Sequence, residues 1–399
     1  MTVEALRCAL LGVSAYRNIT AQPLMADAAA LLEALSLGRG EEAVERYARV
    51  FYALRQAGCR GLGDWLWDAL RYEEAPYPLL AERGERDSAL ECAARRDIGT
   101  FRALAELDCG ELVAKMGGLL PADFAPVLEG LPRWSAGAEF TFENLTEFYR
   151  RNGAGLFARY RAFLWEGGAL TPVERPDCFG GEELLGYERE REQVIANTRA
   201  MLEGREVNNV LLYGEPGTGK SVTVKSLITV PGFEDLRLIQ VQKESLGDMP
   251  ELIRTLGHRR QKFILFIDDL AFDQDDRTYS VLKTILEGGL EPRPANVAVY
   301  ATSNRRHLVR QTFSDRAGDE VDRNETINEK TSLAERFGLR VLYQTLNKAQ
   351  FLDMVEQMAA LRGIAMDRET LRAAAAQFEV RHPGKTPRTA RQFIASLGT

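Results

Sequence analysis

A glycine-rich stretch, GEPGTGKS at residues 214–221, has the clearest chemistry in the sequence. It fits the pattern G-x-x-x-x-G-K-[ST], and it stands between an apolar run typical of a strand and a stretch typical of a helix. Glycines at these spacings let backbone N–H groups surround phosphate groups, and the N-terminus of the following helix adds positive charge. The stretch therefore predicts a phosphate-binding loop.

Two side chains at the end of this stretch extend the prediction. Lys220 is expected to reach the β- and γ-phosphates of a nucleotide, and Ser221 to offer its hydroxyl to Mg²⁺. The alternative is an ordinary glycine turn beside a solvated lysine. The predicted nucleotide-binding residues here are Gly214, Glu215, Pro216, Gly217, Thr218, Gly219, Lys220, Ser221 and Val222.

Two adjacent carboxylates end the apolar run FILFIDDL at residues 263–270. A carboxylate at the end of a buried strand, beside a phosphate loop, typically holds Mg²⁺ through water. Asp268 is therefore the predicted Mg²⁺ residue, together with Ser221. Asp269 follows it directly and is predicted to polarise an attacking water, unless it only caps the next segment.

A third polar position, Asn304, ends the run NVAVYATSN at residues 296–304. Asparagine often ends a strand without a further role. Its place after the phosphate loop and the two acids makes it a candidate for orienting the attacking water by hydrogen bonding. Lys220, Asp269 and Asn304 are thus the predicted reactive group.

The elements that must position these residues are short β-rich runs that alternate with helical stretches. Runs that are apolar on both faces and joined by helices indicate an α/β fold whose parallel sheet is covered on both sides. After residue 347 the chain returns to helices. The predicted strands lie within residues 207–214, 236–242, 262–268, 296–304 and 339–346.

The first part of the chain differs in its pattern of apolar residues from the part that carries the motifs. Helical periodicity runs through residues 41–59 and 88–107, and strand signals are scarce. Prolines and glycines then predict a linker. The predicted division is an all-α N-terminal domain at 1–170, a linker at 171–192, an α/β core at 193–347 and a helical domain at 348–399.

Composition narrows the class of protein. The 399-residue chain has 45% hydrophobic and 27% charged residues, as ordinary globular proteins do. Its formal net charge of -7 argues against a nucleic-acid coat over the whole surface. The five cysteines are scattered without a CxxC pair, which predicts reduced thiols rather than disulfides or a zinc site. No apolar run reaches the length of a membrane span, so we expect a cytoplasmic protein without a membrane partner.

The phosphate loop, the two acids and Asn304, in this order and spacing, resemble an AAA+ ATPase. The resemblance implies ATP and Mg²⁺ as ligands, a five-stranded parallel sheet in the order 5-1-4-3-2, and a C-terminal helical lid. The strings LLGYERERE, LEGGLEPRPANVAVYATSNRRHLV and SLAERFGL are similar to one bacterial AAA+ family of unknown function, over about residues 180–397. Membership would imply a nucleotide mechanism but no particular cellular task.

Further residues take roles by this resemblance. Gly186 and Tyr187 correspond to the stretch beside the adenine. Arg336, in SLAERFGL, corresponds to the arginine finger that enters a neighbouring subunit's site, which implies a homo-oligomer; a surface salt bridge is the alternative. Arg391, in TPRTARQFIASL, best fits the lid arginine that contacts the γ-phosphate, with Arg388 as the alternative.

The sequence departs from the AAA+ pattern at Asp269, where the family usually has glutamate. Aspartate is one methylene shorter, and misplacing a catalytic group by about 1 Å can cost about a hundredfold in rate. Two functions therefore stay open. The first is a Mg²⁺-dependent ATPase that couples nucleotide state to a protein partner held by residues 1–170. The second is a slow nucleotide-dependent switch or scaffold with negligible turnover.

A third hypothesis is a nucleic-acid loader or remodeller. The stretch FYRRNGAGLFARYRAFLWE at residues 148–166 interleaves arginines with aromatic residues, which suits single strands. Such a stretch is more often a pair of amphipathic helices with a solvated basic face, so a protein partner is favoured over nucleic acid. A small-molecule kinase would leave Asn304, Arg336 and the helical lid without a role.

Overall fold

The computed structural model describes residues 1–178, 184–271, 277–287, 292–304, 333–382 and 384–397. The chain divides into two compact units, Met1–Arg159 and Tyr160–Thr399, and each has hydrophobic core residues of its own. Among the described residues, no helix is long and apolar enough to cross a membrane. All five cysteines are free thiols.

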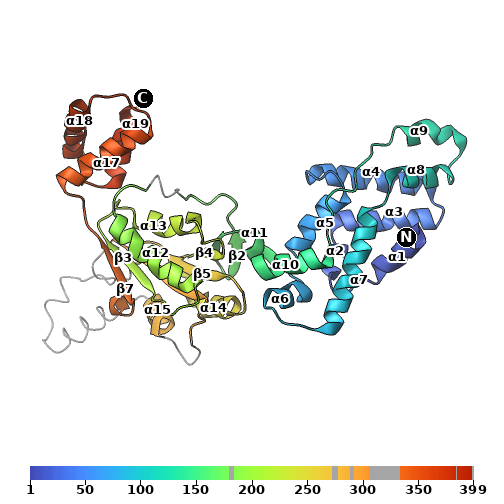
Figure 1. The fold of residues 1–399 in the computed structure, drawn as a ribbon, viewed down its shortest axis with the longest axis horizontal. Coiled ribbons are helices and arrows are strands. Elements are labelled where there is room, and N and C mark those ends of the chain that lie inside the picture. The colour runs from blue at the N-terminus through green and yellow to red at the C-terminus, as the bar shows by residue number, and fades with distance from the viewer. Residues whose placement is uncertain (179–183, 272–276, 288–291, 305–332, 383, 398–399) are drawn as a thin grey trace. The chain divides into compact units, whose positions relative to one another are not determined.

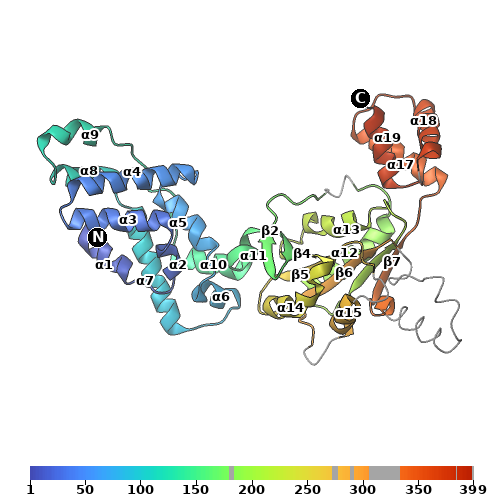
Figure 2. The same cartoon turned by 180° about the vertical axis from the view of Figure 1, so that it is seen from behind.

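The first unit is helical in its described part, as predicted for this half of the chain (Figures 1 and 2). The predicted helical stretches at 41–59 and 88–107 form α4 and α7, and α3 packs beside α4. Its helices are α1 (Val3–Leu11), α2 (Arg17–Thr20), α3 (Pro23–Ser36), α4 (Gly40–Gln56), α5 (Leu62–Arg71), α6 (Pro76–Glu82), α7 (Ser88–Ala105), α8 (Cys109–Gly117), α9 (Ala125–Glu129), α10 (Phe142–Asn152) and α11 (Gly155–Arg159).

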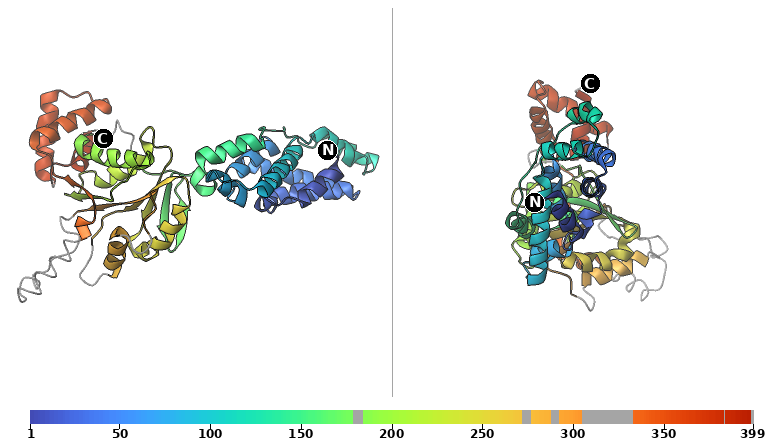
Figure 3. Two further views of the ribbon diagram at one scale, coloured as in Figure 1. Left: turned by 60° about the horizontal axis from the view of Figure 1, so that its bottom comes forward. Right: turned by 90° about the vertical axis from the view of Figure 1, so that its right-hand side faces the viewer.

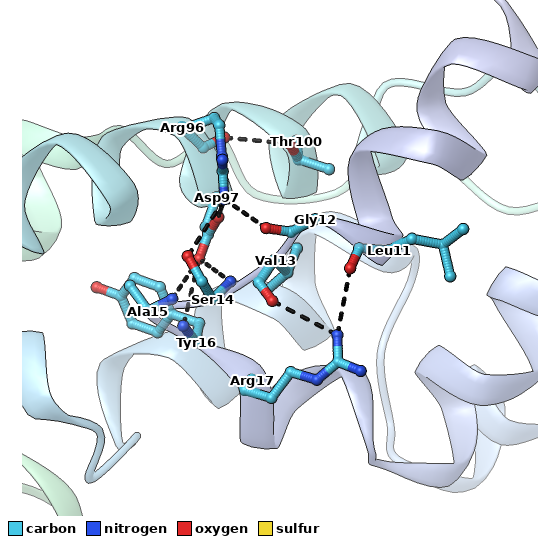
Figure 4. Close-up of polar contacts among 10 residues, drawn as sticks. All are labelled: Leu11, Gly12, Val13, Ser14, Ala15, Tyr16, Arg17, Arg96, Asp97 and Thr100. Atoms are coloured by element: carbon cyan, nitrogen blue, oxygen red, sulfur yellow. Dashed lines mark hydrogen bonds and ion pairs between the residues drawn. The ribbon is translucent and has the colours of Figure 1, made fainter.

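A buried aspartate on α7 fixes the turn between α1 and α2 (Figure 4). Asp97 is 0% exposed, and its Oδ2 accepts hydrogen bonds from the backbone N–H groups of Ser14 (2.8 Å), Ala15 (2.7 Å) and Tyr16 (3.4 Å). Arg96 donates to the hydroxyl of Ser14 and to Oδ1 of Asp97. A carboxylate without partners would be very unfavourable at this depth, so these donors are what allow it to be there.

The second unit is built on a seven-stranded sheet in the order β2-β1-β4-β5-β6-β3-β7. All neighbouring strands are parallel except β1 and β2, which pair antiparallel. Each of the five predicted runs contains a strand, and counted along the chain these five stand in the order 5-1-4-3-2. The strands are β1 (Ala162–Glu166), β2 (Ala169–Pro172), β3 (Val210–Gly214), β4 (Leu236–Val241), β5 (Lys262–Ile267), β6 (Val297–Ser303) and β7 (Leu339–Tyr343).

The predicted count of five strands is wrong, because β1 and β2 add a hairpin to the sheet. Both strands lie where a helical domain to residue 170 and a linker from 171 were predicted. Gly167 and Gly168 have φ of 58° and 75°, the left-handed conformation that two-residue hairpin turns require. β1 then pairs with β4, so the sheet begins directly after residue 160.

Helices cover both faces of the sheet (Figure 1). On one face, α12 (Glu188–Leu202) and α13 (Lys220–Ser226) pack against alternate residues of the strands, such as Leu212, Phe266 and Tyr300. α14 (Met249–Gly257) and α15 (Arg277–Glu287) lie on the opposite face. Because both faces are covered, the strands are apolar on both sides, which is the pattern the sequence showed. α12 begins inside the predicted linker, part of which (179–183) lies outside the described residues.

Three helices at the C-terminus form a small group in the region predicted to be the lid, and the name lid is kept for them (Figure 3). They are α17 (Lys348–Leu361), α18 (Arg368–Arg381) and α19 (Pro387–Leu397), and they share a small apolar core that includes Phe351, Val355 and Phe393. Asn347 forms a capping box with Gln350 at the start of α17, which sets where the lid begins.

Candidate functional site

The glycine-rich loop connects the end of β3 to the start of α13. Gly214 has a φ of 130°, and a Cβ there would lie 2.1 Å from the carbonyl oxygen of Tyr343 on β7. A side chain has no space at that position, so glycine is required. Gly219, with a φ of 98°, is the N-cap of α13. Between them, the hydroxyl of Thr218 donates to the carbonyl oxygen of Glu215 (2.8 Å) and fixes the curve of the loop.

Lys220 lies folded under this loop. Its Nζ donates to the carbonyl oxygens of Gly214 (3.0 Å) and Glu215 (2.7 Å) and to Oδ1 of Asn304 (2.9 Å). The residue is only 5% exposed. Burial lowers the pKa of Lys220, and the nearby carboxylate of Asp269 acts in the opposite direction. The loop therefore holds a partly desolvated cation in a place where an anion would be stabilised.

Asp268 follows β5 and faces the start of α13. Its Oδ1 accepts hydrogen bonds from the hydroxyls of Ser221 (2.6 Å) and Thr302 (2.6 Å). Carboxylate and hydroxyl oxygens are ligands that Mg²⁺ prefers, and here they come from two elements that the sheet brings together. The pair Ser221 and Asp268 therefore fits a magnesium ion by the chemistry of its oxygen atoms.

Asp269 has an unusual backbone. Its φ is 51°, in the left-handed region that residues other than glycine rarely adopt. Its N–H donates to the hydroxyl of Thr302 (2.9 Å), and its Oδ1 accepts from Nδ2 of Asn304 (2.8 Å). Asn304 therefore joins Asp269 to Lys220, because its other side-chain atom accepts from the lysine. The three residues predicted to act together lie in one hydrogen-bonded chain.

Gly186 and Tyr187 form the opposite end of the site, before α12. Both have positive φ values, 75° and 57°. The ring of Tyr187 stacks on that of Tyr343 with centroids 5.0 Å apart, and its hydroxyl donates to the carbonyl oxygen of Gln344. Burial raises the pKa of Tyr187, so its phenol stays a hydrogen-bond donor. Flat rings at this position fit the apolar face of a nucleotide base.

The lid contacts the glycine-rich loop directly. The backbone N–H of Arg388 donates to the carbonyl oxygen of Gly217 (3.3 Å). Gly217 has a φ of 77°, and a Cβ there would lie 3.2 Å from the Cβ of Arg388. Arg388 and Arg391 of α19 both line the space above the loop, so the structure keeps both predicted candidates for the lid arginine beside the site.

A cavity of about 480 Å³ joins these parts, within the usual size range of ligand sites. Gly214 and Glu215 lie outside its lining and contribute through their carbonyl oxygens to Lys220. The predicted residues that line it are Gly186, Tyr187, Pro216, Gly217, Thr218, Gly219, Lys220, Ser221, Val222, Asp268, Asp269, Asn304 and Arg391.

Several lining residues had not been predicted. Thr302 precedes Asn304 by two positions, and the alternation of side chains along a strand places both on the same face, which was the available signal. Arg191 of α12 donates to the carbonyl oxygen of Gly186; it stands in the string LLGYERERE, but no role had been assigned to it. The residues that sequence reasoning missed are Leu184, Leu185, Arg191, Thr223, Thr302, Tyr343, Pro387 and Gln392.

Arg336 does not line this cavity. It follows a short helical turn before β7 and forms an ion pair with Glu287 of α15. Its Nε is buried and makes no hydrogen bond within the described part of the chain. The ion pair matches the alternative weighed for this residue.

Three arginines of the basic and aromatic stretch at residues 148–166 contact other residues of this chain. Arg159 pairs with Asp68 (3.2 Å), and Arg151 pairs with an acid on its own helix. Arg161 donates to a backbone carbonyl, and burial lowers its pKa. The stretch forms α10, α11 and β1 rather than only a pair of helices.

The strand order, the glycine-rich loop and the helical lid together define the class: an α/β core of the AAA+ type. Within that class, the chain belongs to the family described as "Protein of unknown function (DUF815)", whose model matches residues 158–399. The match begins where the second unit begins, and the helical unit lies almost entirely outside it. The predicted resemblance to an AAA+ family of unknown function is thereby confirmed.

No curated protein matches the chain. Among solved structures, the RuvB Holliday junction branch migration motor of Thermotoga maritima is similar to it at 17% identity and a TM-score of 0.36. The similarity covers 54% of this chain and 63% of that one, so less than two thirds of RuvB is spanned. Two single-substitution mutants of RuvB match at 16% and 15% identity with the same coverage.

Proposed function

We propose that this protein binds ATP with Mg²⁺ and hydrolyses it. The observation that carries the proposal is the hydrogen bond of 2.6 Å between Ser221 and Asp268 beside the glycine-rich loop. These two oxygens come from different elements, and they meet next to the buried ammonium of Lys220. An arrangement of backbone N–H groups, one lysine, one hydroxyl and one carboxylate is what a Mg²⁺-bound triphosphate needs.

Each side chain has a task in this proposal. Lys220 and a lid arginine, Arg391 or Arg388, balance the charge of the terminal phosphate. Ser221 and Asp268 hold the metal, which when bound neutralises charge that develops on the phosphate oxygens. Asn304 and Asp269 orient the attacking water, and Asp269 accepts its proton. The rings of Tyr187 and Tyr343 support the base.

The proposed test is a comparison of ATP binding and phosphate release, with and without Mg²⁺, in the wild type and in Asp268→Asn. We expect the variant to bind ATP in the presence of EDTA as the wild type does, and to lose the increase in affinity that Mg²⁺ provides. Asp235→Asn, which removes a carboxylate paired with Arg260 away from the cavity, is the control. Equal responses to Mg²⁺ in Asp268→Asn and the wild type would rule the metal site out.

We further propose that Arg336 acts on the site of a neighbouring copy, so that hydrolysis requires a homo-oligomer, and that the helical unit holds a protein partner. Support comes from Arg336 lying outside its own cavity, with a partly exposed guanidinium held by Glu287. Arg336→Ala and Lys220→Ala would each be inactive alone. Mixing them should restore part of the turnover, since some interfaces then combine an intact loop with an intact arginine. A mixture as inactive as its components would contradict action between copies.

A slow switch is the second candidate, and one observation favours it. The short carboxylate of Asp269 is already held by Asn304 and comes from a strained backbone, so its reach toward a water is limited. In this case the purified protein would retain ATP for many minutes with Mg²⁺ and release no phosphate. Rapid phosphate release would exclude the switch. A nucleic-acid loader gains little support, since three of the four arginines considered for that role, Arg151, Arg159 and Arg161, contact residues of this chain.

A further inference from the structure

Thr302 lies two residues before Asn304 and contacts the segment that carries Asp268 and Asp269. It is in β6, is 2% exposed, and its main-chain position pairs with Leu212 of β3. The two residues that follow Asp268 are both hydrogen-bonded to Thr302. The N–H of Asp269 donates to the hydroxyl of Thr302 (2.9 Å) and, at a longer distance, to Oδ1 of Asp268 (3.2 Å). The N–H of Leu270 donates to the carbonyl oxygen of Thr302 (2.7 Å).

The directions of these hydrogen bonds follow from their chemistry. The ionised carboxylate of Asp268 can only accept, so the hydroxyl of Thr302 donates its single proton to Oδ1 of Asp268 (2.6 Å). A lone pair of the same hydroxyl is then left for the N–H of Asp269. The hydroxyl of Thr302 therefore donates one hydrogen bond and accepts another, which an apolar side chain of similar size could not do.

The second of these bonds has a consequence for the backbone. With a φ of 51°, Asp269 is in a conformation that side chains disfavour and that persists only where the surroundings enforce it. The two N–H groups bound by Thr302 are those of Asp269 and of the next residue, and together they fix this turn. In that conformation the Asp269 carboxylate meets the side-chain amide of Asn304.

We propose that Thr302 is a positioning residue for both acids. It orients Asp268 toward Ser221, and it holds the left-handed turn that brings the short side chain of Asp269 to Asn304. This inference rests on the proposed function and adds an account of Asp269. The turn held by Thr302 determines where the Asp269 carboxylate lies, which lets an aspartate occupy the place of the usual glutamate.

The test compares Thr302→Val and Thr302→Ala, which lack the hydroxyl, with Thr302→Ser, which keeps it. In the two variants without the hydroxyl we expect ATP affinity in EDTA to stay within about twofold of the wild type. We expect turnover to fall about ten- to a hundredfold, as for a misplaced catalytic group. The Mg²⁺ concentration at half-maximal binding should rise about tenfold, since one hydrogen bond to a charged group is lost. Thr302→Ser should retain both properties.

Two further variants separate positioning from a merely structural role. Thr198→Val removes another buried hydroxyl bound to β6, through Tyr300, but away from the cavity. It should lower the melting temperature without changing turnover or the response to Mg²⁺. In an Asp269→Asn background and at saturating Mg²⁺, Thr302→Val should reduce turnover no further, because the Asp269 side chain through which it acts is already altered. The shift in the Mg²⁺ response, which acts through Asp268, should persist.

The outcomes distinguish the inference from the function on which it rests. A wild type that binds no ATP under any condition overturns both. A wild type that binds ATP, with Thr302→Val equal to it in turnover and in Mg²⁺ response, overturns the inference alone. So does a Thr198→Val variant with the same losses as Thr302→Val. If the wild type binds ATP without hydrolysing it, the Mg²⁺ response decides: a shift in Thr302→Val and Thr302→Ala supports the inference, and its absence overturns it.

Discussion

Two aspartates, one in each unit, are held by several hydrogen bonds, and they differ in the kind of donor. Asp97 in the helical unit accepts from three backbone N–H groups and is 0% exposed (Figure 4). Asp268 in the α/β unit accepts mainly from the hydroxyls of Ser221 and Thr302 (2.6 Å each), with one longer bond from the backbone N–H of Asp269 (3.2 Å), and it lines a cavity of about 480 Å³. By the number of donors alone, the two carboxylates look alike.

The difference shows which acid is available for chemistry. Backbone N–H groups in a folded turn cannot move away, so the Asp97 carboxylate is fully used in holding the α1–α2 turn. The hydroxyl of Ser221 can rotate, and Asp268 faces open space, so this carboxylate can exchange one partner for another when a ligand enters. A carboxylate whose hydrogen-bond donors can turn away, and which borders a cavity, is therefore a better candidate for a functional site than one held by fixed backbone donors. Burial and the number of hydrogen bonds distinguish the two cases less clearly.

The largest expected effect is on ATP turnover, through a residue that lines the cavity of the α/β unit. Lys220→Ala removes the buried cation beneath the glycine-rich loop, and we expect ATP turnover to fall by about a thousandfold, as when one preorganised charge contact is lost. The measurement is phosphate release with saturating MgATP. Lys225→Ala, on the same helix but outside the cavity lining, is the matched control and should keep its turnover. Equal losses in both variants would mean that the helix, not the site, had been damaged.

The next largest effect is on the stability of the helical unit. Asp97→Ala leaves three backbone N–H groups of the turn without their acceptor, and we expect it to lower the free energy of unfolding by about 3 kcal/mol. Asp87→Ala, at the N-cap of the same helix, should cost about 1 kcal/mol. Urea unfolding followed by tryptophan fluorescence measures both, since Trp65, Trp67 and Trp134 lie in this unit. Similar losses in the two variants would contradict the role given to Asp97.

A smaller effect sharpens the contrast between Asp97 and Asp268. Asp268→Asn should change the free energy of unfolding by less than about 1 kcal/mol, because acids placed for function add little to stability. Removing one of two adjacent carboxylates also relieves their repulsion. Urea unfolding followed by circular dichroism provides the measurement. A loss as large as that of Asp97→Ala would show that Asp268 is a structural anchor too.

The smallest expected effect concerns the connection between core and lid. Tyr187 packs against the cores of both, and its hydroxyl holds the carbonyl of Gln344, just before the lid. Tyr187→Phe keeps the ring and loses this hydrogen bond, which should weaken ATP binding by about 1 kcal/mol. Titration with a fluorescent ATP analogue would measure it, with the exposed Tyr52→Phe as the control. An unchanged affinity would mean that the hydroxyl has no part in setting the lid.

Much of the α/β unit was predictable because its signals are local. The run FILFIDDL is recognisable as a buried strand from its own residues. GEPGTGKS has glycines at the positions where the loop needs positive φ values or has no space for a Cβ. The strand AFLWE at 162–166 was missed, since five residues after a helical stretch show no clear period. Only its pairing with β4 makes it a strand.

The sequence by itself determined which residues carry chemistry: Lys220, Ser221, the two acids and Asn304 are recognisable from residue type and spacing. Tertiary structure alone decided what holds them. Thr302 gains its role because β6 lies beside β5, and Asp97 because its helix packs on a turn about eighty residues earlier. Backbone preference acts between neighbours in sequence, whereas a hydrogen bond between distant segments exists only after the chain has packed.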